Sequence, residues 1–233
     1  MIPEFLHPIT RPFHPYYLHL VWEPKFEPFT KMYYPRYVSF EDVVIEVGAL
    51  IGASTRFLSY LSKHVYSFEP NKRNFRLLRS YTKKLENVQV YNVALGNHNG
   101  EVYLNIDAKK DYAASSSLSN TAKGKYSGKQ KVRISKLDDF GFPLAPTVLI
   151  LDCEGAEVDV LRGARNTIPN LKSILVETHL LANGKNTIDD VNSQLSTYEQ
   201  FESKLVTAGH EKWIIASNKR FLSSQLMYDA EFL

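Results

Sequence analysis

Apolar runs of four or five residues alternate with amphipathic stretches through the middle of the chain. Val43–Val47 is β-branched and apolar apart from one acid, a pattern typical of a strand buried on both faces of a parallel sheet. The next stretch, Ala53–Lys63, carries Phe57, Leu58 and Leu61 on one helical face. The alternation continues and predicts strands at 65–68, 88–93, 148–151 and 173–176, and helices at 71–85 and 156–163. This order predicts an α/β fold, with a mostly parallel sheet and helices on both faces.

Two further regions carry weaker patterns. Residues 101–106 and 131–134 alternate as strands on either side of a loop that is rich in Ser, Ala, Lys and Gly. Towards the C-terminus, Ile188–Ala208 is predicted as a long helix that ends at Gly209. Residues 213–216 and 223–228 are predicted to close the sheet as a hairpin. We find no internal repeat, and we predict a single α/β domain over residues 41–233.

The first 40 residues follow neither pattern. Seven of the 11 prolines lie in the first 35 residues, and prolines at this spacing exclude a long helix. The same residues are too rich in aromatic side chains for a solvated tail. We therefore predict that residues 1–40 form an extended arm. Three positions are open for it: over the acceptor side of a ligand pocket, against a second subunit in a homodimer, or as a strap on an apolar face.

Composition narrows the class of protein. The chain has 233 residues, 44% of them hydrophobic, and a net charge of +3, which is typical of a globular protein and too mild to indicate nucleic-acid binding. The single cysteine, Cys153, excludes a disulfide framework and favours a reducing compartment, so we expect a cytoplasmic protein. There is no apolar run of about 18 residues, and we predict neither a membrane span nor a signal peptide.

Polar residues gather at the carboxyl ends of the predicted strands, where ligands bind in parallel sheets. Glu69 lies 17 residues beyond Gly52, where an acid can accept both hydroxyls of a ribose. Glycines at 48 and 52 let the backbone approach a ligand, and the helix that follows favours an anionic group at its N-terminus. The predicted cofactor-binding residues are Glu46, Gly48, Gly52, Ser54, Thr55, Glu69, Pro70, Asn92, Ala94 and Asp152.

The spacing of the two glycines selects among nucleoside ligands. It does not match the G-x-G-x-x-G fingerprint of dinucleotide binding, and the chain has no G-x-x-x-x-G-K-[ST] loop for a triphosphate. It suits S-adenosylmethionine, with Glu46 near the cationic end of that cofactor. Asn92 and Ala94 are expected on the adenine side, and Asp152 is expected to contact the cofactor or to orient a loop.

Five segments together resemble a known family. They are V-V-I-E-V-G-A-L-I-G-A-S-T (43–55), Y-S-F-E-P-N-K-R-N-F (66–75), N-V-A-L-G (92–96), L-D-C-E-G-A-E-V-D-V-L-R-G-A (151–164) and L-V-E-T-H (175–179). This set resembles the FkbM-type methyltransferases, class I O-methyltransferases that use S-adenosylmethionine. The resemblance implies a Rossmann-like fold with seven strands, one of them antiparallel. Leu50 stands where the family usually has Asn, and Glu46 where Asp is usual.

A hydroxyl acceptor must lose a proton, so we looked for a base. His179 is the first candidate, because imidazole titrates near neutrality, and Glu154 is the second. For each, a structural role is an equal alternative: a hydrogen bond to a neighbouring loop for His179, and favourable charge at a helix N-terminus for Glu154. Together with Asp152 and Glu177 they could bind Mg²⁺ or Mn²⁺. Carboxylates at neighbouring strand ends are common without metal, however, so we predict no metal here.

The acceptor class is predicted less directly. We favour a small molecule or a glycan. The alternative is RNA, bound by a basic loop at 123–136 that holds six Lys or Arg residues and no acid. Nucleic acid is not favoured, because Tyr126 is the only aromatic residue of that segment. A nicotinamide oxidoreductase, disfavoured by the glycine spacing, and a non-catalytic nucleoside-binding protein are the remaining classes.

Overall fold

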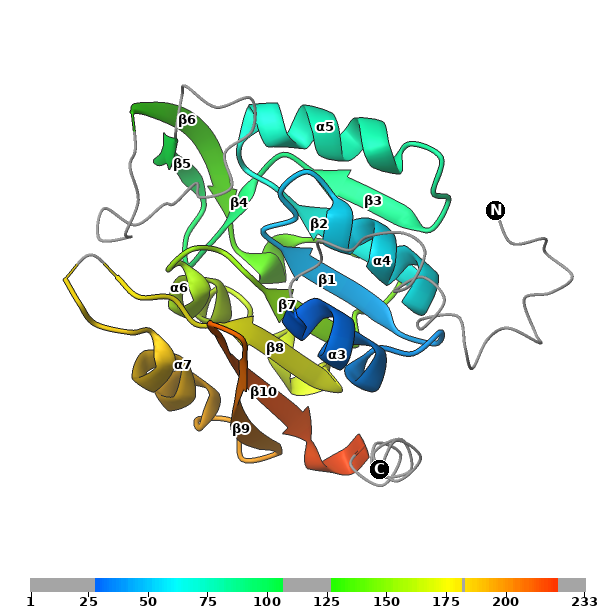
Figure 1. The fold of residues 1–233 in the computed structure, drawn as a ribbon, viewed down its shortest axis with the longest axis vertical. Coiled ribbons are helices and arrows are strands. Elements are labelled where there is room, and N and C mark those ends of the chain that lie inside the picture. The colour runs from blue at the N-terminus through cyan, green and yellow to red at the C-terminus, as the bar shows by residue number, and fades with distance from the viewer. Residues whose placement is uncertain (1–27, 107–126, 182, 222–233) are drawn as a thin grey trace, which may run out of the picture.

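The computed structural model describes residues 28–106, 127–181 and 183–221 (Figure 1). At its centre is a seven-stranded sheet with the strand order β3-β2-β1-β7-β8-β10-β9. Only β10 runs against the others, since it is antiparallel to both of its neighbours. The strands are β1 (Val43–Val47), β2 (His64–Phe68), β3 (Val88–Tyr91), β7 (Val148–Leu151), β8 (Ser173–Glu177), β9 (Phe201–Ala208) and β10 (Glu211–Asn218). The predicted Rossmann-like α/β fold with one antiparallel strand is thereby confirmed.

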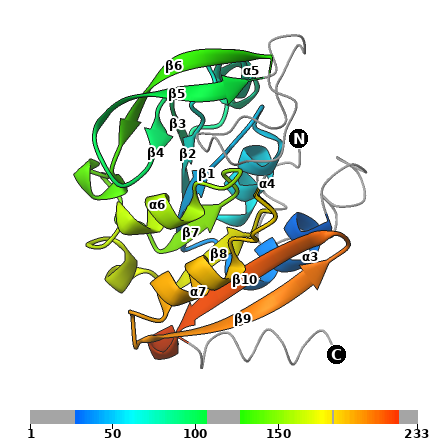
Figure 2. The ribbon, with the colours of Figure 1, turned by 90° about the vertical axis from the view of Figure 1, so that its left-hand side faces the viewer.

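Helices cover both faces of this sheet, as Figure 2 shows. One face carries α3 (Pro28–Tyr37), α4 (Ala53–Leu61) and α5 (Lys72–Thr82), and the other carries α6 (Glu157–Arg162) and α7 (Ile188–Leu195). Alternate side chains of β1 supply both cores: Val44 packs in the cluster that includes α4, and Ile45 in the cluster that includes α6 and α7. No helix in the described part of the chain is long and apolar enough to cross a bilayer.

The arrangement of β1, β2 and β7 brings three loops together. Both β2 and β7 pair with β1 in parallel, so their carboxyl ends meet at one edge of the sheet. Gly48 follows β1 with φ +94°, and a Cβ atom there would lie 1.7 Å from the backbone oxygen of Asp152. Only glycine lets the loop after β1 pass this close to the loop after β7.

A small second sheet extends the fold beyond β3. It consists of β4 (Ala94–Leu95), β5 (Gly100–Ile106) and β6 (Gly128–Ser135) in the order β4-β6-β5. Exposed Lys129, Lys131 and Arg133 alternate with buried or partly buried residues along β6, and Lys131 forms an ion pair with Glu101 of β5 at 2.5 Å. The predicted strand at 131–134 is thereby confirmed as part of β6, whereas the prediction of a basic loop is wrong for residues 128–135. Residues 123–126 lie outside the described part.

The predicted extended arm is wrong for residues 28–37, which form α3 despite Pro35 inside it. Phe29 is wholly buried and stacks on Trp213 of β10, with ring centroids 3.9 Å apart. Tyr34 meets the same indole edge-on. Burial of these rings offsets the backbone hydrogen bond that a proline removes. Residues 38–40 of the predicted arm lie between α3 and β1, and residues 1–27 lie outside the described part.

The predicted long helix at 188–208 is also wrong. It ends at Leu195, and residues 201–208 instead form β9, which pairs antiparallel with β10. Gly209, with φ +66°, lies in the tight turn of this hairpin rather than at a helix end. The sheet is closed by a hairpin, as predicted, but Trp213–Ala216 pair with β9, and the predicted partner 223–228 lies outside the described residues.

Candidate active site

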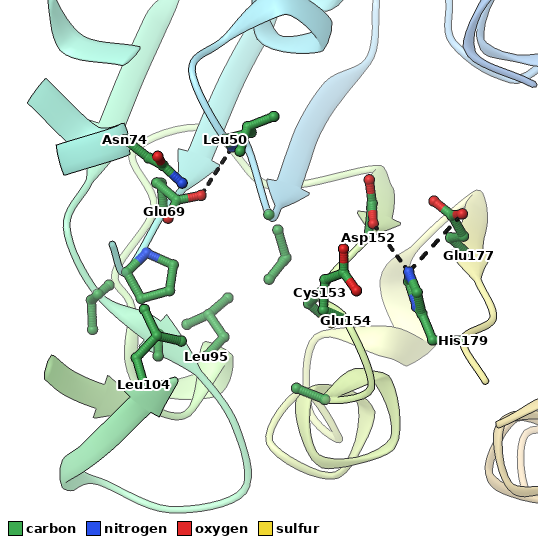
Figure 3. A pocket seen from close by; sticks show the side chains of 16 residues that line it. Leu50, Glu69, Asn74, Leu95, Leu104, Asp152, Cys153, Glu154, Glu177 and His179 are labelled. Atoms are coloured by element: carbon green, nitrogen blue, oxygen red, sulfur yellow. Dashed lines mark hydrogen bonds and ion pairs between the residues drawn. The ribbon is translucent and has the colours of Figure 1, made fainter. Parts of the chain in front are cut away.

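A pocket opens at the carboxyl edge of the sheet, between the loops that follow β1, β2, β7 and β8. Its polar residues form two groups, one on each side (Figure 3). Glu69, with Asn74 and the backbone of Leu50, forms the first group. The wall beside it is apolar, formed by Pro70, Val93, Ala94, Leu95 and Leu104. The second group is acidic and consists of Asp152, Glu154, Glu177 and His179, which we call the acidic end.

Glu69 is buried, and both of its carboxylate oxygens accept backbone hydrogen bonds. Leu50 N–H donates to Oε2 at 2.9 Å and Asn71 N–H to Oε1 at 2.8 Å. Burial raises the pKa of Glu69 to about 8, against the hydrogen bonds from Asn71, Leu50 and Asn74, and the charge of Asp152 adds to the rise. These hydrogen bonds occupy three of the about four acceptor positions of a carboxylate, so one ribose hydroxyl can take the fourth and a second can replace the Asn74 amide.

Asn92 supports Glu69 from behind and does not line the pocket. Its Nδ2 donates to the backbone oxygens of Glu69 and Pro70 at 2.8 and 3.0 Å. This contact fixes the loop after β2, so Asn92 acts through Glu69. Pro70 and Ala94 lie in the pocket wall, as the sequence predicts.

Glu46 and its neighbours do not reach the pocket. Its buried carboxylate accepts hydrogen bonds from Ser54, Thr55 and Ser67, at 2.5, 2.5 and 2.7 Å. Burial raises the pKa of Glu46, and these hydroxyls oppose the rise. Because the side chains of a strand alternate, Glu46 shares the face of Val44 and points under α4.

In addition to Asn92, four of the predicted cofactor contacts thus lie outside the pocket lining. Glu46, Ser54 and Thr55 fasten the first turn of α4 to β1 and β2. Gly52, with φ +93°, lets α4 pack on α5, since a Cβ atom there would lie 2.8 Å from Leu78 Cδ1. None of the four lines the pocket, whereas Gly48, Glu69, Pro70, Ala94 and Asp152 do.

At the acidic end, His179 is held between carboxylates on both sides of its ring. Its Nδ1 lies 2.8 Å from Oε1 of Glu157, and its Nε2 lies 3.6 Å from Asp152 and 4.0 Å from Glu177. The backbone is fixed as well, because His179 N–H donates to Thr187 Oγ1 and its carbonyl accepts from Thr187 N–H. The position of the imidazole is therefore set by three separate contacts.

These surroundings oppose the neutral imidazole that a general base requires. Burial lowers the pKa of His179, but the hydrogen bond and charge of Glu157, with the charges of Asp152 and Glu177, outweigh burial and raise it to about 10. The Nε2 side of the ring thus favours a positive charge, which can be a proton or another cation. Glu154 approaches the same end from a turn in which its own φ is +55°.

Glu157 is the residue that the sequence analysis missed. It is wholly buried on the first turn of α6, and besides His179 its Oε1 accepts the N–H of Gly155 at 2.9 Å. The available signal was an acid three residues before Val160, hence on the same face of this short helix as the apolar Val160 and Leu161. Cys153 lies nearby, where burial and the charges of Glu157 and Asp152 raise the pKa of its thiol well above the usual value, so a nucleophilic role is not supported.

A model of the methyltransferase FkbM domain matches residues 46–204 of the chain. The chain belongs to the FkbM methyltransferase family. Its methyl donor is accordingly S-adenosylmethionine. This FkbM domain is 29% identical over 171 residues to the hexuronic acid methyltransferase AglP of Haloferax volcanii. That match covers 72% of this chain but 64% of AglP, less than two thirds of its length.

Solved structures share the fold of this FkbM domain. A methyltransferase FkbM from Methylobacillus flagellatus KT is similar with a TM-score of 0.59 and 20% identity, over 87% of this chain and 53% of that one. An rRNA methylase from Streptococcus thermophilus has a TM-score of 0.51 and 12% identity, over 79% and 90% of the two chains. At these identities the likeness concerns the fold alone, which agrees with the predicted class I architecture.

The pocket of the FkbM domain fits S-adenosylmethionine in three respects. Glu69 can accept the ribose hydroxyls, and the adjoining apolar wall suits the adenine. Four acids and no Lys or Arg are found among the described residues that line the pocket, which favours the sulfonium and ammonium charges of the cofactor. When bound, the cofactor supplies a methyl group on a positively charged sulfur.

Proposed function

We propose that this chain is an O-methyltransferase whose acceptor is a hydroxyl of a sugar or of a related small molecule. The observation that carries the proposal is the division of the pocket, with a ribose-binding carboxylate on one side and the acidic end on the other. The relative AglP is named for a hexuronic acid, which supports a sugar as acceptor. The match covers 64% of AglP, so the sugar acceptor enters here as part of the proposal.

The chain contributes alignment and proton removal. Glu69 fixes the nucleoside, so the reactive carbon is held at a set distance from the acidic end. Both ring nitrogens of His179 are directed at carboxylates, whereas Glu154 lines the pocket in which an acceptor would lie. We therefore assign the general base to Glu154 and give His179 an acceptor-side binding role. This order reverses the preference that the sequence alone suggested.

RNA was the alternative acceptor, and its main support was a continuous basic loop. In the structure, residues 128–135 of that segment form β6, and Lys131 is paired with Glu101. The described part of the segment thus does not provide the expected loop. We therefore propose a sugar acceptor in preference to RNA.

The proposal is tested with purified protein, isotope-labelled S-adenosylmethionine and a panel of hexoses, hexuronic acids, oligosaccharides and RNA. We expect label in an O-methyl group of a sugar. Glu154→Gln should lower kcat at least a hundredfold and leave the affinity for S-adenosylhomocysteine within twofold. Glu86→Gln, the same change at an exposed site outside the pocket, should behave as wild type. Transfer only to RNA, or full turnover by Glu154→Gln, would contradict the proposal.

A further inference from the structure

We propose that Asp152, Glu177 and His179 form a binding site for a divalent cation at the acidic end. Each residue offers one ligand atom, and the three atoms lie within 4.8 Å of one another. The separations from His179 Nε2 are 3.6 Å to Asp152 Oδ1 and 4.0 Å to Glu177 Oε1. Dashed lines in Figure 3 mark these two contacts. Bonds of about 2.0–2.3 Å to a common ion place ligand atoms about 3–4 Å apart, so small side-chain movements complete the site.

Glu157 provides an independent reason to place an ion there. Metal-binding histidines usually donate the other ring N–H to a carboxylate, which fixes the ring and its tautomer. Glu157 Oε1 accepts from His179 Nδ1 at 2.8 Å, on the side of the ring opposite Asp152 and Glu177. With Nδ1–H donated to Glu157, Nε2 faces the two carboxylates, and a positive charge is needed between them, which a divalent ion can supply in place of the Nε2 proton.

The charge around His179 points the same way. Glu157 is wholly buried, and its Oε2 has no hydrogen-bond partner among the described residues. With Asp152, Glu154 and Glu177 it makes four carboxylates, and no Lys or Arg among the residues described lines the pocket beside them. A buried carboxylate is costly without a compensating positive charge. One divalent ion on the far side of the imidazole supplies more of that charge than a proton can.

The framework behind the ligands is rigid. Asp152 follows β7, and Glu177 and His179 lie at the end of β8 and just beyond it. These two strands are neighbours in the centre of the sheet, with Leu151 paired to Val176. Ligands from adjacent strand ends therefore keep their spacing without help from a mobile loop.

The ligand set and its exposure indicate the ion and its use. Two carboxylates and one imidazole suit Mn²⁺ better than Mg²⁺, which prefers oxygen alone. The Asp152 side chain is 37% exposed, and three protein ligands leave coordination positions open towards the pocket. If the proposed function holds, adjacent oxygens of a sugar acceptor can occupy these positions, and the ion then lowers the pKa of the reacting hydroxyl.

The test is a titration of the full chain with MnCl₂ alone, without cofactor or acceptor, followed by the electron paramagnetic resonance of free Mn²⁺. We expect one saturable site per chain. Glu177→Gln and Asp152→Asn should each weaken the binding at least tenfold, and Glu86→Gln should not change it. Absence of saturation at millimolar Mn²⁺, or equal binding by Glu177→Gln and Glu86→Gln, would overturn the site.

A second measurement needs no variant and so does not depend on whether the variants fold. Electron spin echo modulation of the bound Mn²⁺ should show coupling to one imidazole ¹⁴N, and its absence would overturn the assignment of His179. The outcomes also separate this site from the proposed function. If the chain binds Mn²⁺ but does not methylate sugars, only the proposed function is rejected. If it methylates sugars in the presence of a chelator and does not bind Mn²⁺, only the proposed cation site is rejected.

Discussion

Glu69 is a buried carboxylate that also lines the pocket. Its pKa of about 8 means that the ionised form grows across the neutral range as pH rises. Ionised carboxylates accept hydrogen bonds from hydroxyls more strongly than protonated ones. Cofactor affinity should therefore depend on pH when Glu69 accepts the ribose hydroxyls as proposed.

We predict that the affinity for S-adenosylhomocysteine rises with pH by up to about tenfold per unit below pH 8 and levels off above it. Calorimetric titrations from pH 6.5 to 9 will show this profile. In Glu69→Gln the rise should vanish, and the affinity at pH 8.5 should fall at least tenfold, whereas Glu86→Gln should follow the wild type. A flat wild-type profile would exclude Glu69 as the ribose acceptor.

Single residues also show where sequence reasoning on the site succeeds. Glu69 and Asp152 could be placed because each directly follows a predicted strand, and His179 because it lies three residues beyond the end of another. Glu157 could not, since its partner His179 comes from another element 22 residues away. Glu46 was placed at the pocket because it lies two residues before Gly48, but its direction depends on which face of β1 it occupies.

At the level of the elements, the loop that follows β1 lies directly against the loop that follows β7. Gly48 is the point of contact between the loop after β1 and the loop after β7. Gly141, in contrast, has open space around the position of a Cβ atom and no positive φ. Gly141 therefore serves as a control for the same substitution at Gly48.

Gly48→Ala should destabilise the fold by about 3 kcal/mol or more, because it combines backbone strain at φ +94° with a clash against a main-chain oxygen. Gly141→Ala should stay within about 0.5 kcal/mol of the wild type. Urea unfolding, monitored by circular dichroism, gives both values. Equal stabilities of the two variants would show that the loops can separate without cost.

The burial of each strand explains which strands could be predicted from the sequence. The central strands are buried on both faces and read as short apolar runs, so the sequence located them well. β9 lies at the edge of the sheet, and five of its eight residues are exposed, among them consecutive ones. It therefore lacks the alternation of apolar and polar residues that marks a half-buried strand, and its sequence was predicted as the end of a helix.

In the molecule as a whole, α3 packs against β10 and β9, the last two strands that the structure describes. Its Phe29 stacks on Trp213, although 184 residues separate them in the chain. Met32 lies on the same helix but is 51% exposed. If the stack is part of the domain core, the two positions must differ in their effect on global stability.

Phe29→Ala should lower the free energy of unfolding by about 3–5 kcal/mol, as expected for loss of a buried aromatic ring. Met32→Ala should change it by less than about 0.5 kcal/mol. Thermal and urea unfolding of both variants provide the comparison. If Phe29→Ala changes the free energy of unfolding as little as Met32→Ala does, α3 is not part of the cooperative core and the domain folds without it.

The segment 152–157 serves three functions within six consecutive positions. It contributes Asp152 to the proposed cation site, Glu154 to the pocket wall and Glu157 to the support of His179. The left-handed turn at Glu154 and Gly155 sets the directions of these three side chains relative to one another. Inserting or deleting one amino acid here would displace all three acids at once. Over evolutionary time, the length of this segment should therefore be more constrained than the identity of the residues on the solvent side of α6.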